Sequence, residues 1–84
     1  MIIMGYDIIR TCEASPEQYE VFKDGDQVGY MRLRHGSFYA SIPGSGGRVV
    51  FTASPKGDGL FDDDERLYYL TRAIEAIDGQ LLEW

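Results

Sequence analysis

Few side chains in this sequence are of the kinds that attack a substrate, accept a proton or bind a metal. Cys12 and His35 are the only thiol and the only imidazole, and they fall in different predicted elements. Nucleophilic catalysis needs a nucleophile beside a base that a third group orients, and neither residue lies in such a setting. Common zinc sites and disulfide frameworks need more cysteines and histidines than this. We therefore expect no catalytic residue, no metal and no cofactor, in a chain that is not an enzyme.

Carboxylates are the most abundant chemical groups, since 14 Asp and Glu face 8 Lys and Arg and give a net charge of −6. The densest run is Asp62–Glu65, with Asp58 shortly before it. Consecutive residues of a helix point about 100° apart, so these acids do not converge on one cation, and residues 58–62 do not fit the calcium-loop pattern. We interpret Asp62–Glu65 as the first turn of a helix, where the helix dipole favours acids. The least favoured hypothesis is a metal-dependent enzyme that uses Asp58, Asp62 or His35.

Arginine and tyrosine gather in the middle of the chain. In the alternating run 30–34, Tyr30, Arg32 and Arg34 share one face of a predicted strand, with Tyr39 on the next strand and Arg48 beyond. Tyrosine and arginine are enriched at protein-binding hot spots, and they also stack on bases and pair with phosphates. The alternative is that they only cover a sheet face.

The elements that position these residues follow from turn signals and hydrophobic periodicity. Gly- and Pro-containing turns recur between short runs rich in β-branched and aromatic residues, the pattern of an antiparallel meander. The predicted strands are 19–23, 28–34, 37–42 and 48–53, with a further candidate at 6–11. Asp24-Gly25 predicts a tight hairpin. The glycine-rich segment 43–48 leads into a strand rather than a helix, so we interpret it as a hairpin connection and not as a phosphate loop.

The end of the chain has helical periodicity. Its apolar stripe consists of Leu67, Leu70, Ile74, Ile77 and Leu81. Gly79 is placed to end this helix, and residues 80–84 pack back or form a last short strand. With the sheet, the helix predicts a two-layer α+β domain over residues 1–84: a three- to four-stranded antiparallel meander and one C-terminal amphipathic helix on one face. The expected sheet core is Phe22, Met31, Leu33, Phe38, Ala40, Ile42, Val49 and Phe51.

The first part of the chain leaves two alternatives open. Ser15-Pro16-Glu17-Gln18 has the residues of a helix start, whereas a strand from Tyr19 suits the short space before Lys23. We favour the strand, after at most one helical turn. The apolar residues 1–4 are too few for a signal peptide or a spanning helix, and one lone cysteine fits a reducing compartment, so we expect a cytoplasmic protein with no membrane partner.

These features favour a small acidic protein-binding module that occupies a basic, nucleic-acid-binding site on a partner protein. In size and charge the chain is similar to small phage-encoded inhibitors of bacterial defence systems. The alternative is direct binding of nucleic acid or a phosphorylated ligand by the Tyr/Arg face, which the acidic balance disfavours. The candidate partner-binding residues are Tyr30, Arg32, Arg34, Tyr39, Arg48, Asp58, Asp62, Asp63, Asp64 and Glu65. Pairing of two copies through an exposed edge at 49–51 predicts a monomer or weak homodimer.

Overall fold

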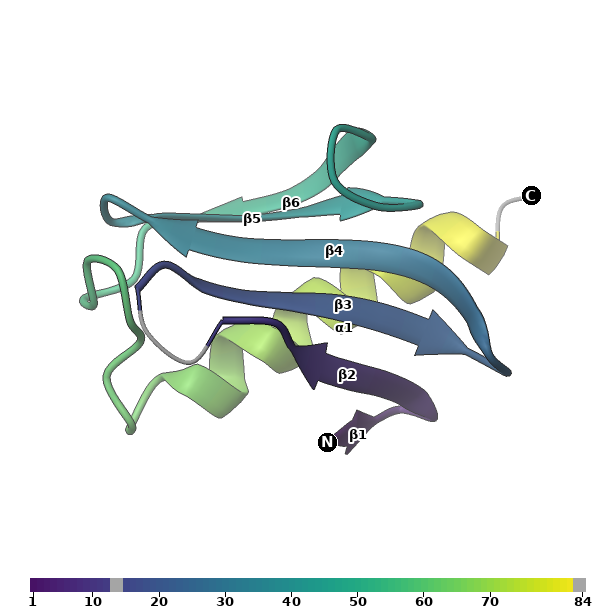
Figure 1. Cartoon of the computed structure of the whole chain (residues 1–84), viewed down its shortest axis with the longest axis horizontal. Coiled ribbons are helices and arrows are strands. Elements are labelled where there is room, and N and C mark those ends of the chain that lie inside the picture. Colours follow the sequence, from purple (N-terminus) through teal and green to yellow (C-terminus); the bar gives the residue numbers. More distant parts are fainter. Residues whose placement is uncertain (13–14, 83–84) are drawn as a thin grey trace.

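The computed structural model describes residues 1–12 and 15–82 (Figure 1). Its elements are β1 (Ile2–Ile3), β2 (Tyr6–Arg10), β3 (Glu17–Lys23), β4 (Asp26–Arg34), β5 (Ser37–Ile42), β6 (Arg48–Ala53) and α1 (Arg66–Leu82). Each strand pairs antiparallel with the next, so the order in the sheet is the order in the chain. The predicted α+β class, antiparallel meander and C-terminal helix are confirmed. The predicted strand count is wrong, because the described residues form six strands.

Three of the hairpins use the same two-residue turn with positive φ at both positions. The predicted Asp24-Gly25 turn has φ values of 52° and 88°, and His35-Gly36 in the β4–β5 connection has 54° and 73°. Met4-Gly5, with 55° and 84°, joins β1 to β2. This backbone matches the twist of adjacent antiparallel strands, which explains how a strand as short as Ile2–Ile3 adds to the sheet.

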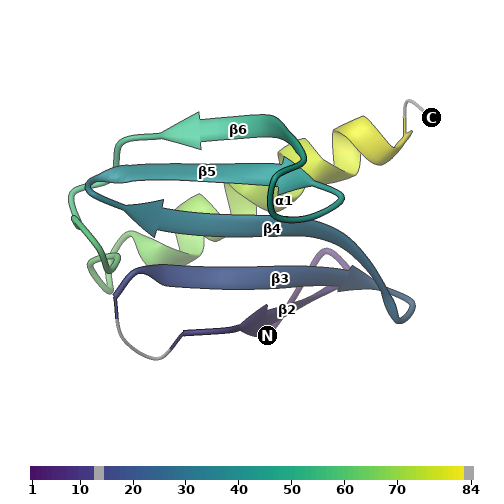
Figure 2. The same cartoon turned by 45° about the horizontal axis from the view of Figure 1, so that its top comes forward.

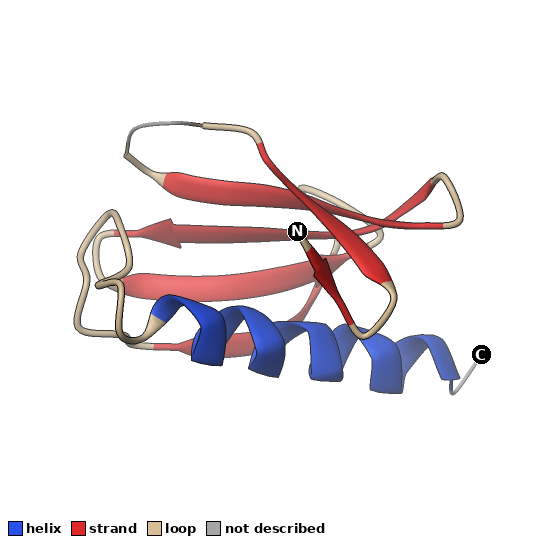
Figure 3. Cartoon of the chain, turned by 90° about the horizontal axis from the view of Figure 1, so that it is seen from below, coloured by secondary structure: helices blue, strands red, loops and turns tan. Residues whose placement is uncertain are grey.

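The helix covers one face of the sheet and leaves the other without a covering layer (Figure 3). Leu70, Ala73, Ile74 and Ile77 of α1 are fully buried against the inward-facing side chains of the strands. The predicted place of Leu67 in this stripe is wrong, since its side chain is 61% exposed. The helix packs mainly on β4, β5 and β6, and Leu67, the second residue of α1, is not part of the core cluster.

The core differs from the expected list at both edges of the sheet. Tyr6, Ile8, Tyr19 and Val21 are buried in it, because β2 and β3 extend the sheet beneath the helix. Phe22 lies on the face opposite the helix, where it pairs with the exposed Asp7. Val49 is 51% exposed. Both were expected in the core. Phe22 is outside it because it alternates with the inward-facing Tyr19 and Val21 of β3, and Val49 is outside it because a bulge shifts the β5–β6 register and puts it opposite Ser41.

Two predicted element boundaries are also wrong. Gly79 does not end α1, which continues to Leu82; its backbone is helical, and a Cβ built on it would meet nothing within 4 Å. The favoured strand is confirmed, but it begins at Glu17 and not at Tyr19, and in the described residues 15–18 a bend at Ser15 and Pro16 stands in place of a helical turn. Residues 83–84, which were expected to pack back or to form a last short strand, lie outside the described residues.

Within the described residues, no helix combines the length and the apolar character that a membrane crossing requires.

Candidate protein-binding surfaces

Residues 54–65, which we call the acidic loop, connect β6 to α1 at the left end of the molecule in Figure 1. Asp58, Asp62, Asp63 and Asp64 are all exposed there, and the side chain of Asp63 is 97% accessible. The acids were expected in the first turn of the helix. They form the turn that leads into α1 (Arg66–Leu82): the Glu65 N–H donates to the Asp62 carbonyl at 3.0 Å, and the Arg66 N–H donates to the same carbonyl at 3.1 Å, which is the i→i−4 bond that opens the helix.

Glu65 is buried and holds the backbone of the acidic loop. One of its carboxylate oxygens accepts the Lys56 N–H at 2.8 Å, and the other accepts those of Gly57 at 2.8 Å and Asp62 at 2.9 Å. The bond to Asp62 is the return half of a capping box at the helix start. Only 7% of Glu65 is exposed, so this predicted partner-binding residue supports the loop from inside.

Glu17, the first residue of β3, holds the same loop from the other side. Its side chain is fully buried on the helix-covered face of the sheet. The carboxylate accepts the Phe61 N–H at 3.0 Å, the Arg66 Nε at 2.7 Å and the Tyr19 hydroxyl. Arg10 approaches the same carboxylate at 4.0 Å. The sequence analysis did not identify Glu17, Arg66 or Arg10 as members of a site.

Both glutamates are held in the charged form. Burial alone would raise the pKa of Glu17, but hydrogen bonds from Arg66, Tyr19 and the Phe61 N–H, with the Arg66 charge, outweigh burial and lower it. For Glu65 as well, burial would raise the pKa, and the three backbone N–H groups and the Lys56 charge lower it. The two side chains therefore act as buried anions whose partners are backbone donors and cations of this same chain.

Two backbone hydrogen bonds complete the attachment of the acidic loop. The Glu17 N–H donates to the Gly59 carbonyl at 2.8 Å, and the Gly36 N–H donates to the Asp58 carbonyl at 2.6 Å. The chain is tightly folded here, since a Cβ on Gly57 would lie 1.9 Å from the Leu60 carbonyl oxygen. The loop is thus fixed to β3 and to the β4–β5 turn, which brings Asp58 next to that turn.

Some of the charge at the surface of the acidic loop is balanced locally. Lys56 Nζ lies 2.9 Å from Asp64 Oδ2 and 3.9 Å from Asp62 Oδ2, and Arg66 Nη1 lies 2.7 Å from Asp63 Oδ1. Exposed pairs of this kind are weak and exchange readily with water. The three aspartates therefore remain available to a cationic partner.

We call the side of the sheet turned away from α1 the open face (Figure 2). The burial pattern of β4 and its register with β5 put Tyr30, Arg32, Arg34 and Tyr39 on this face. Tyr30, Arg32 and Arg34 alternate with the buried Met31 and Leu33 on β4. The register puts Arg32 opposite Tyr39 of β5, so these two residues share this face.

Within this group, accessibility decreases from Arg34 to Tyr30. Arg34 is exposed and Arg32 is half-buried. Tyr30 is only 8% exposed, with its ring 6.2 Å from that of Tyr39 and its hydroxyl donating to Gln18 Oε1 at 3.0 Å. In the described part of the chain, the Nε atom of Arg32 is the one buried side-chain nitrogen or oxygen that has no hydrogen-bond partner.

Arg48 does not join this group. Its guanidinium donates to Gln80 Oε1 of α1 at 2.6 Å, so its side chain reaches toward the helix and away from the open face. The bulge between Ala40 and Ser41 shifts the β5–β6 register, which puts Arg48 opposite the buried Ile42.

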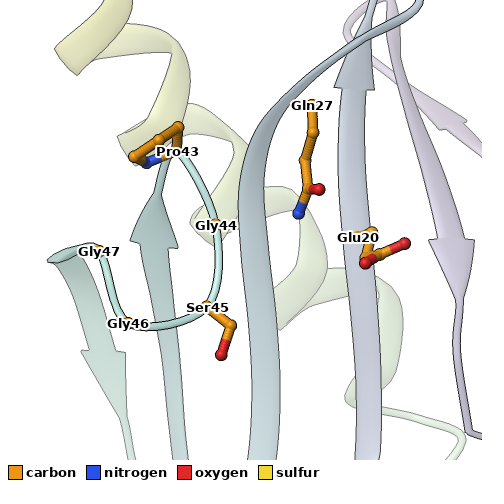
Figure 4. Close-up of a pocket in the computed structure, with 7 residues that line it drawn as sticks. All are labelled: Glu20, Gln27, Pro43, Gly44, Ser45, Gly46 and Gly47. Carbon is orange, nitrogen blue, oxygen red and sulfur yellow. The ribbon is translucent and has the colours of Figure 1, made fainter.

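A shallow groove of about 580 Å³ lies at one corner of the open face, between the 43–47 connection and the β3–β4 hairpin (Figure 4). Glu20 and Gln27 line one side, and the connection from Pro43 to Gly47 lines the other. The Ser41 hydroxyl donates to the Gly44 carbonyl at 2.8 Å and fixes the base of the connection. Glu20 is the single charged residue of this groove, and the buried Glu17 is not part of it.

The residues considered for catalysis lie on separate connections. Cys12 follows β2, and His35 is the first residue of the β4–β5 turn. Among the described residues, no group of three or more His, Cys, Asp or Glu side chains is arranged to hold a metal ion.

Comparison of the chain with protein-family models, curated proteins and solved structures finds no match.

Proposed function

We propose that this chain is a small, acidic, non-enzymatic protein-binding module, and that its acidic loop occupies a basic site on a partner protein. Such a site is typically one that binds nucleic acid, so the module would act as an inhibitor of that binding. A single free cysteine, Cys12, suits a reducing compartment, and the proposal therefore assigns the module to the cytoplasm.

The observation that carries this proposal is the attachment of the acidic loop. Two buried carboxylates, Glu17 and Glu65, bind its backbone, while Asp62, Asp63 and Asp64 stay at the surface. A loop that is ordered before binding loses little conformational freedom when a partner arrives. Fixed carboxylates also speed association with a basic surface through electrostatic steering.

Affinity capture from cells that carry the chain tests this proposal with three baits. They are the wild type, D63N/D64N in the acidic loop, and D24N/D26N in the β3–β4 turn, which removes the same charge elsewhere. We expect basic proteins on the wild-type and D24N/D26N baits and their loss from the D63N/D64N bait. Capture of only neutral or acidic proteins, or equal capture by all three baits, contradicts the proposal.

A second candidate function is supported by the open face. Arg32 and Arg34 take part in no ion pair within the described residues, and the buried Nε of Arg32 is an unused donor. Together with Tyr39, they suit single-stranded nucleic acid or a phosphorylated ligand. Binding to single-stranded DNA and RNA, measured while salt is lowered, tests this candidate: R32Q/R34Q should abolish it, and no retention of the wild type at low salt rules it out.

A further inference from the structure

The charges of the open face are divided between its two halves. Asp7 of β2 and Glu20 of β3 lie on one side of the sheet centre, and Arg32 and Arg34 of β4 lie on the other. None of the four forms an ion pair within the described residues. The face thus presents two anions on β2 and β3 and two cations on β4, and its nearest opposite charges, Glu20 and Arg32, are diagonal neighbours across the β3–β4 pairing that form no ion pair.

Exposed apolar side chains flank these charges on both sides. Ile2 of β1 is 73% exposed and Ile9 of β2 is 44% exposed; their pairing with Asp7 and Glu20 puts them on the same face. Val49 of β6 is 51% exposed and pairs with Ser41, on the open-face side of β5. A protein that covers this face would remove these aliphatic groups from water, which stabilises the association.

We propose that a second copy of this chain covers the open face. A two-fold axis that lies in the plane of the face, midway between the acidic and the basic pair, puts the carboxylates of each copy over the arginines of the other. Two-fold dimers use one self-complementary patch in this way. The proposal goes beyond the proposed function, which uses the acidic loop at the end of the molecule.

The size of the face suits this partner. Seen down its shortest axis, as in Figure 1, the molecule measures 33 × 23 Å, a footprint close to the roughly 800 Å² that each partner buries in a standard interface. Because the face is partly polar and its charges are exposed, the dimer forms reversibly, as the concentration of the chain rises.

The groove beside Glu20 provides a seat for an arginine of the second copy. A guanidinium has five N–H donors and binds best where several acceptors converge. Here the side chains of Glu20, Gln27 and Ser45, which offer a carboxylate, an amide and a hydroxyl, line the same groove (Figure 4). Glu20 and Arg32 lie nearest to the proposed two-fold axis in the register of the sheet, so Arg32 of the second copy is the arginine that comes opposite this groove.

Charge exchange between two variants tests the proposal, with sedimentation velocity over a wide concentration range as the readout. In D7K/E20K all four face charges become positive, and in R32E/R34E they become negative. We expect the wild type to dimerise, and each variant alone to associate at least about tenfold more weakly, because like charges are then opposed. An equimolar mixture of the two variants should restore a heterodimer, since each opposed pair again combines opposite charges.

D63K/D64K is the matched control, because it changes the net charge by the same amount as D7K/E20K but lies outside the open face. D63K/D64K should dimerise like the wild type but no longer bind the basic partners of the acidic loop. Failure of the dimer proposal can therefore be told apart from failure of the proposed function. Circular dichroism shows whether each variant is folded. If a double variant does not fold, the single variant E20K or R34E is used in its place.

Three results would overturn the proposal. They are a wild type that stays monomeric at every concentration, dimers that persist in both face variants, and a mixture that stays monomeric. Persistent dimers would point to pairing through the edge strand β6, which carries no face charge. A wild type that stays monomeric but loses nucleic-acid binding in R32E/R34E would assign the face to nucleic acid.

Discussion

Two acidic regions lie at opposite ends of the sheet, and they are built in different ways. The β3–β4 turn carries Asp24 and Asp26 on a two-residue hairpin whose positive φ values suit Asp and Gly. The acidic loop carries Asp62, Asp63 and Asp64 on a segment of twelve residues, 54–65, that has no regular structure of its own except the turn before α1.

The difference is in what holds each region in place. The turn is set by local backbone geometry, namely the positive φ values of Asp24 and Gly25. The acidic loop is fixed by Glu17 and Glu65, whose carboxylates are buried, and by Arg66, which binds both Glu17 and the Phe61 carbonyl. Burying a charge is costly unless the charge is paired. Here the pairing of both carboxylates offsets that cost, and the result is one loop held in a fixed shape.

The largest expected effect is that of Glu17→Gln, which breaks the buried pair with Arg66. Removal of one partner of a buried pair typically costs about 3 kcal/mol or more, a large part of the roughly 4–12 kcal/mol expected for a chain of this length. Urea unfolding followed by circular dichroism measures this loss. Glu75→Gln, at the exposed pair with Arg72, is the control and should change stability by less than about 0.5 kcal/mol. Equal effects of the two substitutions would contradict the role given to Glu17.

Glycine substitutions compare the two acidic regions directly. Gly57→Ala puts a Cβ against the Leu60 carbonyl and should destabilise the chain by about 2–3 kcal/mol. Gly25→Ala meets no atom within 4 Å and bears only the cost of a left-handed alanine, about 1 kcal/mol. Urea midpoints give both values. A larger loss for Gly25→Ala would mean that the acidic loop yields easily and is not tightly held.

The lowered pKa values of Glu17 and Glu65 predict a dependence of stability on pH. A carboxyl whose pKa is lower in the folded state stabilises the fold above its unfolded pKa of about 4.3 and loses that contribution as the pH falls through its folded pKa. We therefore expect the free energy of unfolding to decrease below about pH 4.5, and to decrease less steeply in Glu17→Gln. An identical acid profile in the variant would show that Glu17 is not the group involved.

The smallest effect is expected at Gly79, which belongs to neither acidic region. Gly79→Ala removes a flexible residue from the exposed side of α1 and should stabilise the chain by about 0.5–1 kcal/mol. Thermal unfolding measures the gain. A loss of stability would mean that α1 ends near Gly79, as its sequence alone suggested.

Local patterns were enough to predict much of the fold. The alternation in 30–34 and 37–42 and the Asp24-Gly25 turn give strands and a hairpin that match the structure. The period of Leu70, Ile74 and Ile77 gives the helix and its buried stripe. Strand β1 has only two residues, too few for a periodic signal, and its existence depends on the tight Met4-Gly5 turn.

The hydrogen bonds by which Glu17 and Glu65 hold the backbone of the acidic loop could not be predicted in the same way. Glu65 has the sequence position of a helix-capping acid, and nothing local indicates that its carboxylate reaches the N–H groups of Lys56 and Gly57. Glu17 had a usable signal, since it continues the inward alternation of Tyr19 and Val21 by one step. That signal points to a charge inside the core, and only the position of Arg66, which depends on how the helix docks, makes such a charge acceptable.

Hydrogen–deuterium exchange of the acidic loop tests the central claim most directly, because it reads the amides that the two glutamates bind. We expect the amides of Lys56, Gly57, Phe61 and Asp62 to exchange as slowly as those of the central strand β4. Glu65→Gln should accelerate exchange at Lys56, Gly57 and Asp62, the three amides that donate to Glu65. If these four amides exchange in the wild type as fast as an unstructured peptide, the loop is not held, and the account of a preformed acidic surface is wrong.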